Sequence, residues 1–95
     1  MIIVKTSEEI ELMRESALVV SKTLGEVAKL VKPGITTLQL DKIAEECIRD
    51  QGAIPGFLGL YDFPNTLCMS PNTQVVHGIP NGNPLVEGDI ISIDC

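Results

Sequence analysis

The sequence is poor in aromatic residues, with no tryptophan, one tyrosine and two phenylalanines among its 95 residues. Its hydrophobic share of 44% is ample for a globular protein and is almost entirely aliphatic. A chain this short buries only a modest fraction of its surface. We therefore expect one small domain at most, whose core is partly completed by residues outside this chain.

The chain also has few positively charged residues compared with its acidic ones. Seven Lys and Arg face thirteen Asp and Glu, which gives a net charge of −6. Because phosphate binding needs clustered Lys and Arg, this balance argues against a nucleic-acid surface. The glycine patterns of nucleotide-binding loops and the Cys/His spacing of zinc fingers are missing as well.

The chain has only three cysteines, Cys47, Cys68 and Cys95. They are widely separated and form no Cys-x-x-Cys motif. This usage favours a reduced cytosolic protein over a disulfide-stapled secreted one. The apolar segment at residues 2–4 is too short for a signal peptide, and no apolar run approaches the roughly 20 residues that span a bilayer. We expect a cytoplasmic protein without membrane contact.

Two amphipathic helices are predicted in the first half. Each begins at a capping box, Thr6 with Glu9 and Thr36 with Gln39. The break at residues 32–34 separates them, and Gly52 offers a stop for the second. This arrangement could belong to a coiled coil or to an antiparallel helical pair that covers one face of a sheet, and it favours the helical pair. The predicted stripe of the first helix is Ile10, Met13, Ala17, Val20, Leu24, Val27 and Val31, and that of the second is Leu40, Ile43, Ala44, Cys47 and Ile48.

Short strands are predicted after Gly52, where Gly, Pro, Asn and Asp become frequent. They lie around residues 67–69, at residues 75–76 and over residues 90–94. In the last of these, Ile91 and Ile93 share one face while Ser92 and Asp94 share the other. Helices followed by antiparallel strands indicate an α+β fold.

The single histidine, His77, stands between the apolar residues 75–76 and a Gly-Ile-Pro turn. Gly78 would let the backbone approach a bound group, and Pro80 would stiffen the turn. A histidine there can hydrogen-bond or ligate at neutral pH. A strand-end histidine with a structural hydrogen bond fits the spacing equally well.

Asp94 ends an apolar strand, where a buried carboxylate needs a cation or a donor. A divalent metal would supply the cation, since hard oxygen ligands suit Mn, Fe(II) or Co. The residues alone favour a simpler interpretation, in which Asp94 caps a following loop. Asp62 and Asp89 are expected in turns.

Several motifs together resemble the N-terminal part of the type I methionine aminopeptidases, and the resemblance extends over essentially the whole chain. The most specific are the His-Gly-Ile-Pro turn at residues 77–80 and the Gly-Asp-Ile-x-x-x-Asp strand at residues 88–94. The others are Ile3-Val4-Lys5-Thr6, Glu11-Leu12-Met13-Arg14, Val31-Lys32-Pro33-Gly34, Phe57-Leu58-Gly59, Phe63-Pro64, Leu67-Cys68-Met69-Ser70 and Asn72.

The resemblance implies an α+β pita-bread fold, of which residues 1–95 would be the N-terminal half: two helices packed on a curved antiparallel sheet. It implies removal of the initiator methionine from nascent proteins with two divalent metal ions, Co, Mn, Fe(II) or Zn. The N-terminal methionine of nascent peptides, and the ribosome, are the implied partners. The isolated 95-residue chain is expected to be inactive, with an incomplete metal site.

Single residues carry over as follows. Asp94 matches the first of five metal ligands, and the others would lie beyond Cys95. His77 matches a catalytic histidine that also contacts the substrate. The remaining substrate-binding positions, which line the methionine pocket, are Phe57, Leu60, Phe63 and Cys68.

The chain departs from the family pattern near this pocket. The family commonly has Tyr and Gly where this chain has Leu60 and Asp62, although Tyr61 is a neighbouring aromatic. Pro71 and Thr73 replace the usual Val and Glu. Two alternatives are a non-catalytic pita-bread module that binds peptides or proteins, and a prolidase or aminopeptidase P, which usually carries an extra N-terminal domain.

Overall fold

The first helix, α1 (Ser7–Ala28), starts at the predicted capping box. The computed structural model describes all residues from Met1 to Cys95. Thr6 Oγ1 accepts a hydrogen bond from the Glu9 N–H at 3.1 Å, and the Glu9 carboxylate accepts one from the Thr6 N–H at 2.8 Å. The helix ends at Ala28, so Val31, the last residue of the predicted apolar stripe, lies outside it.

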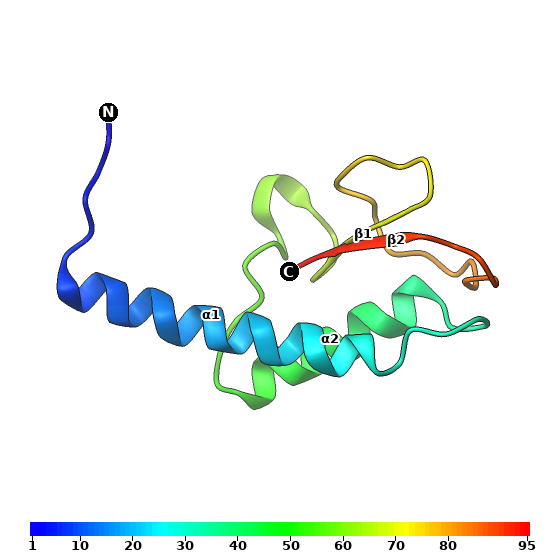
Figure 1. Cartoon of the computed structure of the whole chain (residues 1–95), viewed down its shortest axis with the longest axis horizontal. Coiled ribbons are helices and arrows are strands. Elements are labelled where there is room, and N and C mark those ends of the chain that lie inside the picture. Colours follow the sequence, from blue (N-terminus) through cyan, green and yellow to red (C-terminus); the bar gives the residue numbers. More distant parts are fainter.

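Only the second half of α1 packs against the rest of the chain. Thr23 and Val27 are fully buried, whereas Ile10 and Met13 are about half exposed, at 46% and 55%. Figure 1 shows the first turns of α1 extending away from the other elements. The predicted packing of the whole apolar stripe is therefore wrong for its first half. No helix combines the length and apolarity that crossing a membrane requires.

The second helix, α2 (Thr37–Asp50), also begins at its predicted capping box, formed by Thr36 and Gln39. Gly52 terminates it with a φ of +79°, a conformation that glycine adopts without cost. The two helices run antiparallel beneath the strands (Figure 1). The predicted helical pair is confirmed.

The sheet has two antiparallel strands, β1 (Cys68–Pro71) and β2 (Ile91–Asp94). A short 3-10 helix, η1 (Leu60–Asp62), precedes them. Residues 75–76 form no strand and are exposed, so the strand predicted there is wrong. Two adjacent valines are too little pattern to distinguish a strand from an exposed loop.

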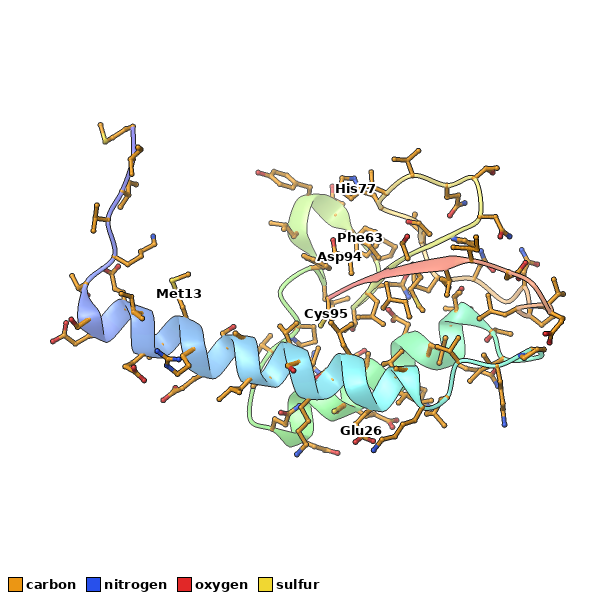
Figure 2. The ribbon with its side chains drawn as sticks, in the orientation of Figure 1. Met13, Glu26, Phe63, His77, Asp94 and Cys95 are labelled. Carbon is orange, nitrogen blue, oxygen red and sulfur yellow. The ribbon has the colours of Figure 1, made fainter.

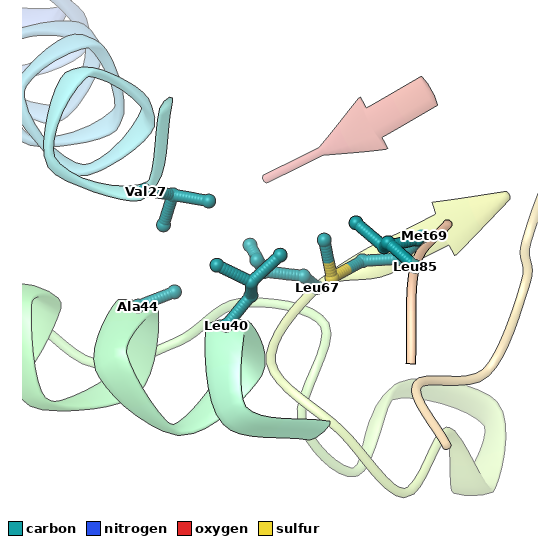
Figure 3. Close-up of a cluster of buried hydrophobic side chains, with 6 residues drawn as sticks. All are labelled: Val27, Leu40, Ala44, Leu67, Met69 and Leu85. Atoms are coloured by element: carbon teal, nitrogen blue, oxygen red, sulfur yellow. The ribbon is translucent and has the colours of Figure 1, made fainter. Parts of the chain in front are cut away.

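Strand alternation separates the core from the opposite face of the sheet. Met69 pairs with Ile93, and both contact the core; Cys68 pairs with Asp94, one residue out of phase, so these two point away from it. The predicted division of the last strand into two faces is confirmed. Figure 3 shows the core, which consists of Val27, Leu40, Ala44, Leu67, Met69 and Leu85.

A buried carboxylate attaches the loop before β1 to α2. Asp41 is only 5% exposed. Its oxygens accept hydrogen bonds from the Leu67 N–H at 2.6 Å, the Thr66 N–H at 3.1 Å and the Asn65 side-chain amide at 3.1 Å. No cation lies among its hydrogen-bond partners, so these donors compensate for the burial of the charge.

We predict that Asp41→Ala destabilises the chain by about 3 kcal/mol, because two buried backbone N–H groups would lose their acceptor. Asp50→Ala is the matched control, since Asp50 is exposed at the last position of the same helix. Urea denaturation followed by circular dichroism measures both. Equal unfolding midpoints for the two variants would contradict a stabilising role of the Asp41 hydrogen bonds.

Candidate active site

Seven residues line a hollow of about 350 Å³, and all six residues singled out from the sequence are among them. Figure 2 shows three of these, Phe63, His77 and Asp94, gathered near the end of β2 on the side away from α1. The hollow has polar and apolar walls together, as small-molecule sites do. Its lining residues are Phe57, Leu60, Tyr61, Phe63, Cys68, His77 and Asp94.

Cys68 and Asp94 are cross-strand partners in the sheet, and both side chains line this hollow. Asp94 is exposed, while Cys68 is 8% exposed. Burial raises the pKa of the Cys68 thiol, and the nearby carboxylates of Asp94 and Asp41 raise it further. Cys68 is therefore a protonated thiol at neutral pH, which suits an apolar wall better than a nucleophile.

The 3-10 helix contributes two residues, Leu60 and Tyr61, to the lining of the hollow. Its residues Tyr61 and Asp62 have left-handed φ values of +49° and +63°, and the preceding Gly59 has +83°. The Gly59 N–H donates to the Phe63 carbonyl at 2.8 Å and closes this turn. Tyr61 lines the same hollow as Leu60, so the chain keeps a tyrosine at this wall, one position along. No sequence pattern singles out Tyr61 beyond its adjacency to Leu60.

His77 is held by its neighbour Gly78. The Gly78 carbonyl accepts from the Met69 N–H at 2.9 Å, and the Gly78 N–H donates to the Ser70 hydroxyl at 3.0 Å. A Cβ at Gly78 would lie 2.1 Å from the Met69 carbonyl oxygen, so only glycine fits. The sequence predicted a close approach of Gly78 to a bound group; the close approach is to strand β1 instead.

A second link precedes β2. The Asn72 side chain accepts from the Ile90 N–H at 3.0 Å and donates to Asp89 at 3.1 Å. Asp89 also accepts from the Val86 N–H, and these two hydrogen bonds lower the pKa of its carboxyl group. The turn role predicted for Asp89 is confirmed, and the turn places β2 in register with β1.

Asp94 carries a carboxylate, a group of the kind that hard divalent cations prefer. Nowhere do three or more His, Cys, Asp or Glu side chains gather closely enough to hold a metal ion. Residues 1–95 therefore do not fit a complete metal site, and their chemistry is limited to what His77, Asp94 and the walls of the hollow provide.

A larger hollow of about 550 Å³ lies between α1 and the loop that follows α2. Neither His77 nor Asp94 borders it. Size alone would favour this hollow as a binding site, but the smaller one holds the residues capable of acid–base or metal chemistry.

The chain matches the model of metallopeptidase family M24 over residues 11–95. It is 53% identical to a methionine aminopeptidase of Clostridium perfringens, with 100% of this chain and 38% of that protein covered. It is 51% identical to methionine aminopeptidase 1 of Bacillus subtilis, with 99% of this chain and 38% of that protein covered. The chain thus spans well under half the length of these relatives.

The fold agrees with these similarities. The crystal structure of methionine aminopeptidase from Rickettsia prowazekii superposes with a TM-score of 0.94 at 38% identity, over 98% of this chain and 38% of that one. The predicted α+β pita-bread architecture is confirmed by this match. The sequence motifs, the arrangement of helices and strands, and the family match agree, and the chain belongs to metallopeptidase family M24.

Proposed function

We propose that residues 1–95 are the N-terminal portion of a methionine aminopeptidase domain, which removes the initiator methionine from nascent proteins by metal-assisted hydrolysis. The observation that carries this proposal is the joint presence of His77, Asp94 and four apolar wall residues around one hollow. The identity of 53% to a relative named methionine aminopeptidase supports the substrate.

The hollow suits a methionine side chain. Its volume of about 350 Å³ is near the lower end of small-ligand pockets, roughly 300 to 1,000 Å³. Two phenylalanines, Phe57 and Phe63, stand beside Leu60 and the protonated thiol of Cys68. A thioether gains favourable contacts with aromatic rings and with apolar walls of this kind. We assign these four residues, together with His77, to substrate binding.

His77 is the proposed catalytic residue of this portion. His77 lines the same hollow as Asp94, and it is exposed to solvent. An imidazole in that place can donate a hydrogen bond to a peptide carbonyl and stabilise the charge that develops there during hydrolysis.

Asp94 is the proposed metal ligand. A pair of divalent ions, Co, Mn, Fe(II) or Zn, would activate water and polarise the scissile carbonyl. One carboxylate cannot hold such a pair, so a complete site needs ligands that residues 1–95 do not supply. The cytoplasmic location, expected from the cysteine usage, and a contact with the ribosome, implied by the family resemblance, stay predictions.

The first test is His77→Ala in a completed chain, in which residues 1–95 are joined to the part of the Clostridium perfringens relative that the match leaves uncovered. We predict a fall in methionine release of more than tenfold, with the bound metal unchanged, because the imidazole acts on the substrate and not on the metal. Release from a Met-containing peptide and metal analysis measure the two quantities. Full activity of the variant would contradict the role of His77.

The second test uses residues 1–95 alone. With added Co(II) or Mn(II), we expect no release of methionine above the uncatalysed rate, because a single carboxylate does not assemble a two-metal site. The completed chain at the same protein and metal concentrations is the control. Turnover of residues 1–95 comparable to this control would show that the proposed division of the site is wrong.

A further inference from the structure

Strand β1 forms hydrogen bonds along both of its edges. The Asn72 N–H, just after the strand, donates to the carbonyl of Ile90, the residue just before β2. Successive N–H groups along a strand point to opposite edges, so the Met69 N–H points away from β2. Its acceptor is the Gly78 carbonyl at 2.9 Å. The segment that carries His77 therefore lies along the free edge of β1.

Ser70 adds a second bond to the same residue. Its hydroxyl accepts from the Gly78 N–H at 3.0 Å, and Ser70 is only 4% exposed. Both backbone groups of Gly78 are thus bound by consecutive residues of one strand. A residue bound at both its N–H and its C=O has little freedom to rotate about its backbone. Because the Gly78 N–H lies in the same peptide plane as the His77 carbonyl, His77 is restricted as well.

His77 needs such restraint because its backbone is strained. Its φ of +59° lies in the left-handed region, which is unfavourable for a residue with a Cβ. A conformation of this kind persists only where the surroundings enforce it. The imidazole itself is the donor or acceptor of no side-chain hydrogen bond in the chain, so its position depends on its backbone.

We propose that Ser70 is a positioning residue for His77: its buried hydroxyl fixes the Gly78 N–H and thereby keeps the imidazole directed into the hollow. Ser70 itself does not line the hollow and so acts only through the backbone. This inference rests on the proposed function for its effect on catalysis, but the restraint itself can be measured without any activity.

The first experiment measures amide hydrogen exchange by NMR in the unmodified chain. The Gly78 N–H has the Ser70 acceptor, whereas the N–H groups of Val75 and Val76 in the same loop have none. We expect Gly78 to exchange at least tenfold more slowly than these two valines. Equally fast exchange of all three would overturn the proposal, whether or not any variant folds.

Substitution then separates positioning from general stability. Ser70→Ala removes the acceptor, and Ser92→Ala is the matched control, since Ser92 pairs with Ser70 across the sheet but is exposed. We expect Ser70→Ala to speed Gly78 exchange at least tenfold and to shift the His77 ring signals, with Ser92→Ala changing neither. Unchanged Gly78 exchange in Ser70→Ala would overturn the proposal.

A double-mutant cycle in the completed chain connects the restraint to catalysis. Ser70→Ala should lower kcat at least fivefold with little change in KM, and should have no further effect once His77 is replaced by Ala. Losses that multiply would mean that Ser70 supports the fold generally, and would overturn the proposal. If the unsubstituted completed chain releases no methionine, the proposed function fails, while the exchange data still decide the role of Ser70.

Discussion

The register of β1 against β2 is the constraint on which the rest of the site depends. Because Cys68 lies opposite Asp94, the carboxylate and the thiol emerge on one face while Met69 and Ile93 fill the core on the other. A slip of one residue would exchange the two faces, burying Asp94 and exposing the core. The apolar cluster and the site therefore stabilise the same register.

The loops around this pair of strands are held by hydrogen bonds from a few polar side chains. Asp41 fixes the loop that leads into β1, Asn72 and Asp89 fix the turn that leads into β2, and Ser70 holds Gly78. Asp41, Asn72 and Ser70 each accept a hydrogen bond from a backbone N–H of another segment, those of Leu67, Ile90 and Gly78. A site built on exposed loops gains in this way the fixed geometry that catalysis or binding requires.

The two helices differ in how much of their length packs against the core. The second half of α1 and all of α2 cover the core, but the first half of α1 keeps Ile10, Leu12 and Met13 exposed to solvent. The observed local support for this half is the capping box of Thr6 and Glu9 at its start. The buried residues of α1 are Thr23 and Val27; α1 packs against α2, and Val27 belongs to the same core cluster as Met69 of β1.

The sequence by itself determined the features that depend on neighbouring residues. The capping boxes at Thr6 and Thr36, the stop at Gly52 and the two faces of the last strand follow from local hydrogen bonds and from the periods of helix and strand. The residues alone singled out His77 and Asp94 as candidates, and the family resemblance gave them roles and added Phe57, Leu60, Phe63 and Cys68. Only the tertiary structure decided that these six meet at one hollow, because contacts between loops distant in sequence depend on strand register and on buried hydrogen bonds. Ser70 and Asp41 were not found from the sequence for the same reason, and Tyr61 was noted only as a neighbour of Leu60, because a single polar or aromatic residue has no local pattern that reveals its distant partner.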